Sequence, residues 1–143
     1  MAQTRYLLDT NVFVNLLRNN STNVTTRLTQ VGIAVCALSE ITEAELRVGA
    51  EISQRPAYQH ALIDQLIATM PVLPITSAIR LYASERARLQ ASGRKLQDFD
   101  LLIGVTAVAN GLTVVTNNAK HFDRLPLQIE DWTLENVLLG DLA

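Results

Sequence analysis

The sequence predicts an α/β fold with three layers, in which a mostly parallel central sheet is flanked by helices. Short apolar runs at residues 6–8, 33–38 and 112–116 are typical of buried strands, because they lack the alternation of a half-exposed strand. Helical patterns separate these runs, which indicates parallel pairing through right-handed crossovers. The chain has 143 residues, 48% of them hydrophobic, so residues 1–143 suit one domain around one core.

The helices and strands follow one another without a linker or an internal repeat. Apolar residues at helical spacing predict helices over residues 11–19 and about 24–30, and Ser39 is expected to cap a third helix that ends near Ser53. Thr42 and Glu45 also have capping-box spacing, which leaves open a start a few residues later. Prolines around a short apolar run predict an edge strand over residues 71–75. The remaining expected elements are a helix from Pro56 to about Thr69, a helix from Thr76 or Ser77 to about Ser92, a helix that Asp98 caps and Gly111 ends, and a last strand over residues 127–132.

Composition and charge exclude some classes of protein. No apolar run approaches the roughly 20 residues of a membrane span, so we expect no membrane association, and the N-terminus has no secretory pattern. The single cysteine, Cys36, lies in an apolar run, which favours an inert thiol and a reducing, cytoplasmic location. The formal charge of −2 gives no electrostatic sign of a nucleic-acid-binding surface. Every basic residue except Lys95 and Lys120 is Arg, however, and Arg suits phosphate contacts.

Asp9 follows the first predicted strand and precedes a helix. One interpretation is a helix cap, since Asp at this position commonly accepts hydrogen bonds from unpaired backbone N–H groups. The other is a functional carboxylate, because ligands bind outside the carboxyl ends of the strands in open α/β sheets. Further acidic residues at similar places in the chain favour the second interpretation.

Glu45 shares one side of its predicted helix with four apolar residues, and we expect that side to face the core. An ionised carboxylate that faces a core is unfavourable unless it is paired or bound to a metal. Glu45 is therefore expected either to form a buried salt bridge with an Arg or to act as a metal-binding or catalytic carboxylate. The apolar residues on this side are Ile41, Ala44, Val48 and Ile52.

Asp100 and the end of the strand at 112–116 add further polar groups. Asp100 projects from the first turn of its helix on the same face as Gly104 and Ala107, and these small neighbours predict open space beside the carboxylate. Thr116 and Asn118 place a hydroxyl and an amide at the carboxyl end of a strand. We expect these groups to lie at the same edge of the sheet as Asp9.

Carboxylates brought together in a dry cleft repel one another, and a divalent cation offsets that cost. Carboxylate, amide and hydroxyl oxygens without a His or Cys cluster favour Mg²⁺ or Mn²⁺ over zinc, and His60 and His121 are too scattered to suggest a zinc site. Such a cluster commonly performs phosphoryl chemistry, since the metal activates a water and stabilises charge on the phosphate. Arg86, on the predicted inner stripe of its helix with Ile79, Tyr82, Ala83 and Leu89, is expected either to pair with a carboxylate or to bind phosphate.

The chain resembles the PIN-domain ribonucleases, most closely the VapC-type toxins of toxin–antitoxin pairs. The resemblance implies a PIN-like fold, dependence on Mg²⁺ or Mn²⁺ and endonucleolytic cleavage of RNA. It also implies a small antitoxin partner that inhibits the site, a homodimer, and a higher assembly of toxin with antitoxin. The matching segments, in the order of the family, are residues 8–11, 41–50, 93–94 followed by 99–100, and 115–118 with Phe122.

Matched position by position, Asp9, Glu45 and Asp100 correspond to the acidic triad of the family and are the expected metal ligands. Thr116 is expected to hold a metal-bound water or an acid. Many members have Asp where this chain has Asn118, so the resemblance leaves open whether one or two metal ions bind. Asn118 offers a carbonyl oxygen or positions a water, and these five residues are the candidate catalytic set.

Two other functions remain possible from the sequence. The first is a PIN-like binding module with impaired catalysis, for which the uncharged Asn118 is the main argument. The second is a phospho-acceptor regulatory domain, which is also an α/β fold with acidic residues and Mg²⁺ at strand ends. Against the second, the strand before Asp9 ends in a single Asp, and no central strand ends in a clear acceptor Asp.

Overall fold

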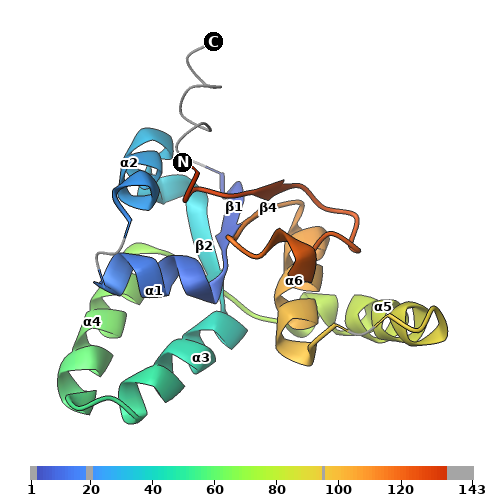
Figure 1. The fold of residues 1–143 in the computed structure, drawn as a ribbon, viewed down its shortest axis with the longest axis horizontal. Helices are drawn as coiled ribbons and strands as arrows, with labels where there is room; N and C mark the ends of the chain where they lie inside the picture. Colours follow the sequence, from blue (N-terminus) through green and yellow to red (C-terminus); the bar gives the residue numbers. More distant parts are fainter. Residues whose placement is uncertain (1–2, 19–20, 95, 135–143) are drawn as a thin grey trace.

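In the computed structural model, which describes residues 3–18, 21–94 and 96–134, five short strands form one central sheet (Figure 1). They are β1 (Tyr6–Leu8), β2 (Cys36–Ser39), β3 (Val72–Leu73), β4 (Thr113–Val115) and β5 (Ile129–Glu130). All pairings are parallel in the order β3-β2-β1-β4-β5, which confirms the predicted class and the edge position of β3. The strand order reverses between β1 and β4, so a crevice for a ligand is expected at their carboxyl ends.

Six α-helices surround the sheet in the described part of the chain (Figure 1). They are α1 (Thr10–Arg18), α2 (Thr22–Val31), α3 (Glu40–Glu51), α4 (Pro56–Thr69), α5 (Ile79–Ala91) and α6 (Asp98–Asn110). Three 3₁₀ turns are added at Ile33–Val35, Thr76–Ala78 and Ala119–His121. None of the described helices is long and apolar enough to cross a membrane.

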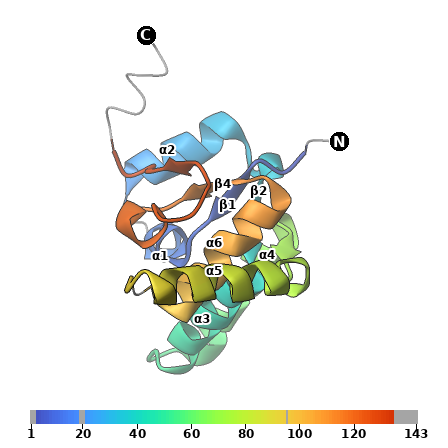
Figure 2. The ribbon, with the colours of Figure 1, turned by 90° about the vertical axis from the view of Figure 1, so that its right-hand side faces the viewer.

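The two faces of the sheet pack against different helices, which gives the three layers that the sequence predicts. Tyr6 and Leu8 of β1 share a buried cluster with Phe13 of α1 and with residues of α2, α3 and α4. Leu7 points to the opposite face, where it packs with Ile103 of α6. Helix α5 lies outside α6 rather than on the sheet, as Figure 2 shows. Both faces of β1 are therefore buried, consistent with its unbroken apolar sequence.

The run at residues 33–38 is a strand only in its second half. Ile33–Val35 forms a 3₁₀ turn, and β2 begins at Cys36. Gly32 has φ = +88°, a conformation that turns the chain at the end of α2 and delays its entry into the sheet. The predicted cap is confirmed, because the Ser39 hydroxyl accepts a hydrogen bond from the backbone N–H of Ile41 at 3.0 Å.

The predicted inward face of α3 is wrong. The buried residues of this helix are Thr42, Leu46 and Ala50, whereas Val48 is 60% exposed and Ile52 is 81% exposed. Helix α3 packs along α1 and α4, and the α3–α4 hairpin extends past the sheet, so its end has no core on the side that the apolar pattern suggested (Figure 1). An apolar periodicity shows that a helix has an apolar side, but it does not show what covers that side.

Two predicted caps are also wrong. The turn at Thr76–Ala78 precedes α5, and no side-chain cap forms there. Asp98 is the first residue of α6 rather than its cap, and its Oδ1 accepts hydrogen bonds from the Tyr82 hydroxyl at 2.8 Å and from the Arg86 guanidinium. Arg86 therefore takes the ion-pair role that the sequence left open. Tyr82 and Leu89 of the predicted inner stripe are packed, but Ile79 and Ala83 are exposed because α5 packs mainly against α6 and the turn before it.

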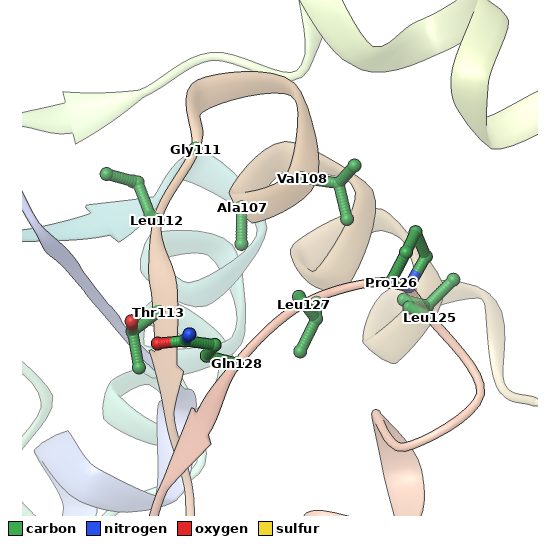
Figure 3. Close-up of a pocket in the computed structure, with 9 residues that line it drawn as sticks. All are labelled: Ala107, Val108, Gly111, Leu112, Thr113, Leu125, Pro126, Leu127 and Gln128. Atoms are coloured by element: carbon green, nitrogen blue, oxygen red, sulfur yellow. The ribbon is translucent and has the colours of Figure 1, made fainter.

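A pocket of about 630 Å³ opens between the end of α6 and the segment before β5 (Figure 3). Leu112 and Thr113 line it, and Thr113 begins β4, so the pocket lies at the amino ends of the strands. None of the residues that line this pocket is ionisable. It is therefore separate from the polar edge where the candidate site residues gather.

Gly104 is required by close packing inside α6. A Cβ atom at this position would lie 2.3 Å from Cδ1 of Leu125, which is buried. The sequence suggested open space beside Asp100, next to the small residues Gly104 and Ala107, and this prediction is wrong. Phe122 and Leu125 pack against this part of the helix and fill the space.

We expect Gly104→Ala to lower the free energy of unfolding by about 1–3 kcal/mol, the usual cost of overpacking a core. Gly49→Ala is the matched control, since Gly49 also lies inside a helix but has nothing within 4 Å of the added Cβ. That control is expected to stabilise the protein by roughly 0.5–1 kcal/mol through helix propensity. Urea unfolding of both variants measures the difference, and equal effects would contradict the packing argument.

Candidate active site

The candidate site begins with Asp9, the residue that follows β1. Its carboxylate is buried, and Oδ1 accepts a hydrogen bond from the backbone N–H of Thr10 at 2.7 Å. Oδ2 accepts a hydrogen bond from the hydroxyl of Thr116, the residue that follows β4, at 2.9 Å. Asp9 thus precedes α1 as a cap would, but its second oxygen is directed across the sheet edge. The parallel pairing of β1 with β4 brings these two residues together.

Thr116 and Asn118 are linked through the backbone. The Thr116 Oγ1 atom accepts a hydrogen bond from the backbone N–H of Asn118 at 3.0 Å. The same hydroxyl donates its one proton to Asp9, since a carboxylate can only accept. Asn118 therefore helps to orient Asp9 through its main chain, and the roles predicted for its side chain stay predictions.

Glu45 approaches the same edge from α3, where it is half-buried. The Thr10 hydroxyl lies 2.6 Å from Glu45 Oε1 and 3.2 Å from Thr42 Oγ1. A hydroxyl has one proton, so when Thr10 donates to Glu45, Thr42 is left to donate to Thr10. Thr10 therefore contacts two carboxylates, one through its N–H and one through its hydroxyl. Glu45 forms no salt bridge with another residue that the structure describes, so the buried pair with an Arg, the alternative that the sequence left open, is not found there.

Thr10 is a residue that the sequence interpretation did not assign to the site, although it lies in the matching segment 8–11. The neighbouring Asn11, which completes the motif, has an exposed side chain. The sequence could have indicated this role, because Thr10 begins a helix directly after a strand. At that position both its backbone N–H and its hydroxyl are near the end of the strand. Thr42 and Glu45 are three residues apart on one helix and so face the same neighbour.

Asp100 joins the cluster from the first turn of α6, and a second missed residue contacts it. The Nδ1 atom of His121 lies 3.0 Å from Oδ2 of Asp100. His121 belongs to the 3₁₀ turn Ala119–His121 after β4 and is half-exposed. The sequence interpretation set His121 aside because it is far from His60, but its partner is a carboxylate rather than a second imidazole.

Burial and mutual repulsion raise the pKa of two of these carboxyl groups. The pKa of Asp9 is raised chiefly by burial and further by the charge of Asp100, while the hydrogen bonds from Thr116 and Thr10 lower it. The pKa of Asp100 is also raised, first by burial and then by the charge of Glu45, while His121 acts in the lowering direction. Asp100 therefore interacts electrostatically with both other carboxylates, which makes the three groups one cluster.

The donor set suits a hard divalent cation in its chemistry. Carboxylate and hydroxyl oxygens predominate, and a cation would relieve the repulsion among Asp9, Glu45 and Asp100. Within the described ranges, no three His, Cys, Asp or Glu side chains converge closely enough to enclose one ion. The carboxylates face one another as repelling charges at the strand ends rather than as a closed set of ligands. Their oxygen-rich composition fits Mg²⁺ or Mn²⁺ better than zinc.

Comparison with known proteins agrees with this arrangement. Residues 6–127 match the family model of the PIN domain. The tRNA(fMet)-specific endonuclease VapC of Shigella flexneri is 34% identical over 131 residues, which cover 90% of this chain and 98% of that protein. The ribonuclease VapC2 of Haemophilus influenzae is 29% identical over 130 residues, with coverages of 90% and 98%.

Solved structures give the same result. The DNA-bound VapBC of Salmonella typhimurium matches with a TM-score of 0.84 and 32% identity, over 91% of this chain and 99% of that chain. FitAcB of Neisseria gonorrhoeae matches with a TM-score of 0.79 and 27% identity, over 89% and 97%. The parallel sheet has carboxylates where its strand order reverses, between β1 and β4, and this arrangement is that of a class of nucleases. The chain belongs to the PIN-domain family and, within it, to the VapC ribonucleases. This membership confirms the resemblance and excludes the phospho-acceptor interpretation.

Asp98 and Asp100 provide a matched pair for testing the electrostatics, since both lie in the first turn of α6. The pKa of Asp98 is lowered, mainly by the hydrogen bond from Tyr82 and then by Arg86, whereas the pKa of Asp100 is raised by burial. A carboxyl group whose pKa is lower in the folded than in the unfolded protein stabilises the fold at pH values above its unfolded pKa. A carboxyl group whose pKa is higher in the folded protein destabilises the fold in that pH range.

We therefore expect Asp100→Asn to raise the melting temperature at pH 7 in a chelating buffer, and Asp98→Asn to lower it. Both effects are expected to disappear at low pH, where the two carboxyl groups are protonated and therefore uncharged. The ordinary pKa of such a group is 3.8. Thermal unfolding followed by circular dichroism at several pH values measures both. A lower melting temperature for Asp100→Asn at pH 7 would refute the repulsive cluster.

Proposed function

We propose that the chain is a metal-dependent endoribonuclease that hydrolyses RNA phosphodiester bonds as the toxin of a toxin–antitoxin pair. The observation that carries this proposal is the cluster of three carboxylates near the carboxyl ends of β1 and β4, in which Asp100 interacts electrostatically with both Asp9 and Glu45, and Thr10 contacts both Asp9 and Glu45. The VapC ribonucleases to which the chain is similar support the reaction class. We also propose that the chain works as one PIN domain in the cytoplasm, where the buried free thiol of Cys36 stays reduced.

The residues of the cluster have different roles in this proposal. Asp9 and Asp100 hold a divalent cation, and Glu45 is a further ligand or the base that orients the attacking water. The cation supplies an activated water and stabilises negative charge on the phosphate. Thr116 and Thr10 fix the Asp9 carboxylate, which is supported by their hydrogen bonds at 2.9 Å and 2.7 Å.

Mg²⁺ is the proposed cation, with Mn²⁺ as the alternative. Both prefer oxygen donors, and Mg²⁺ retains several of its waters, so a site with few protein ligands is sufficient. Asn118 is neutral where many family members have Asp, which favours one tightly held ion over two. His121 contacts one oxygen of Asp100 at 3.0 Å, which leaves the other oxygen for the cation.

The proposed partner is a small antitoxin protein that covers the site. Solved relatives of this chain are VapBC complexes, which supports such an assembly. A pocket of about 210 Å³ between α1, α3 and α4 is lined by apolar side chains that include Val14, Leu17 and Leu46, with Glu45 beside them. An apolar antitoxin segment fits this pocket and would lie next to the carboxylates. We further propose a toxin homodimer within the larger assembly.

A second candidate function is a binding module without catalysis, which the neutral Asn118 favours. In that case RNA or the antitoxin would bind, but the phosphodiester bond would not be cleaved. The variant Asn118→Asp distinguishes the two functions, because an added carboxylate is expected to increase metal-dependent cleavage only if the rest of the site is competent.

Cleavage of total cellular RNA by the purified, antitoxin-free protein tests the proposed activity. We expect fragments with Mg²⁺ or Mn²⁺, none with a chelator, and a loss of at least about 100-fold in rate for Asp100→Asn. Because the Shigella flexneri relative is named for tRNA(fMet), that tRNA is the first defined substrate to assay.

Asp98→Asn is the control for this experiment, since Asp98 lies in the same helical turn but pairs with Tyr82 and Arg86. Its cleavage rate is expected to stay within about threefold of the unmodified protein, as the usual cost of a surface pair is small. Folded protein that cleaves no RNA with either metal, with or without Asn118→Asp, would exclude the nuclease and leave the binding module.

A further inference from the structure

A basic groove lies beside the candidate active site. It has a volume of about 510 Å³ and is lined by Arg94, Lys120, Asp123 and Arg124. Three of these four side chains are cations, in a chain with 12 basic and 14 acidic residues and a formal charge of −2. The groove therefore concentrates positive charge that the composition of the chain does not suggest.

The groove adjoins the carboxylate cluster through the 3₁₀ turn after β4. Lys120 is the neighbour of His121, whose Nδ1 lies 3.0 Å from Asp100. Arg94 arrives from the other side, in the turn that follows α5, where its backbone N–H donates to the Leu89 carbonyl at 2.9 Å. Two segments that are distant in the sequence thus bring cations to one side of the site.

The segment that carries Lys120 and Arg124 is firmly anchored. Phe122 and Leu125 are buried, and Leu125 occupies the space that the missing side chain of Gly104 leaves. The Arg88 guanidinium donates a hydrogen bond to the Arg124 carbonyl at 2.8 Å, which ties the segment to α5. The positive charges are therefore held on a fixed support rather than on a free loop.

Ion pairing among the described residues does not account for the charges of Arg94 and Lys120. Arg86 and Arg88 of the adjacent α5 are paired with Asp98 and Glu85. Among the residues that the structure describes, neither Arg94 nor Lys120 has a salt-bridge partner, and Asp123 is too far from them to form one. A ligand with several negative charges would complete this groove.

We propose that this groove binds the phosphates of the RNA strand next to the bond that is cleaved. This inference rests on the proposed function, and it adds the surface that holds the substrate. Arg and Lys contacts to phosphates position a strand without reading its sequence. They also attract a polyanion to a site whose own carboxylates would repel it.

The test compares Arg94→Gln/Lys120→Gln with the control Arg55→Gln/Arg80→Gln, which removes two exposed arginines from other parts of the surface. The probe is a short fluorescent single-stranded RNA of mixed sequence. Binding is measured by anisotropy over a range of salt concentrations in a chelating buffer, so that no RNA is cleaved. Thermal unfolding checks that all proteins are equally folded.

We expect the groove variant to reduce the slope of log K against log salt by about 0.7 for each lost phosphate contact, or about 1.4 in all. If both proteins bind equally at 1 M salt, this difference in slope makes the groove variant bind roughly 25-fold more weakly than the unmodified protein at 0.1 M salt. In the cleavage assay, KM is expected to rise while kcat is unchanged, because the lost contacts act equally on substrate and transition state. The control is expected to change neither.

Several results would overturn this proposal. An equal effect of the control variant would show a response to net charge alone, and an unchanged slope and KM would exclude the groove as a phosphate site. Weaker antitoxin binding with unaltered RNA binding would assign the groove to the protein partner. Because binding is measured without metal, a weakened groove variant together with no cleavage by the unmodified protein would refute the nuclease and keep the groove. Normal cleavage with an unaltered KM would refute only the groove.

Discussion

The candidate site depends on one buried carboxylate, that of Asp9. Burial makes an ionised carboxylate unfavourable, and the hydrogen bonds from the Thr10 N–H and the Thr116 hydroxyl offset part of that cost. The second bond exists only because β1 and β4 pair in parallel, so that the residues after both strands meet. Thr10 links Asp9 to Glu45, because its N–H donates to the first carboxylate and its hydroxyl donates to the second. The sheet pairing therefore influences the geometry of groups that come from three different parts of the chain.

The first turn of α6 shows how one short segment serves both the fold and the site. Asp98 faces α5, where Tyr82 and Arg86 contact it and lower its pKa, so its charge stabilises the packing of the two helices. Asp100 faces the sheet edge, where burial and the other carboxylates raise its pKa, so its charge opposes folding. Natural proteins commonly keep such unfavourable groups where function requires them. The contrast separates the two acids by their surroundings, although both have the same side chain and lie in the same helical turn.

The parts of the site that local rules control were predictable from the sequence. Asp9 and Thr116 follow apolar strands directly, and parallel strands place their carboxyl ends together, so their proximity follows from the pattern. The contact between His121 and Asp100 was not predictable in this way, because it depends on how the turn after β4 folds back over α6. The orientation of α3 was misjudged for a similar reason: exposed apolar residues such as Val48 belong to a hairpin that extends past the core. The periodicity of a sequence shows that one helix has an apolar side, whereas the side that becomes buried depends on the neighbouring elements.

Net charge was a poor guide to the electrostatics of this chain, because charges of opposite sign are separated in space. The acidic cluster occupies the ends of β1 and β4, and the groove with Arg94 and Lys120 lies on its α5 side. A polyanion is repelled by the first and attracted by the second, so its approach depends on the distance between them rather than on the formal charge of −2. A divalent cation at the carboxylates would neutralise most of their negative charge and so remove most of the repulsion that the strand meets there. Cation and basic groove would then act together on the same strand, the first at the bond to be cleaved and the second on the phosphates beside it.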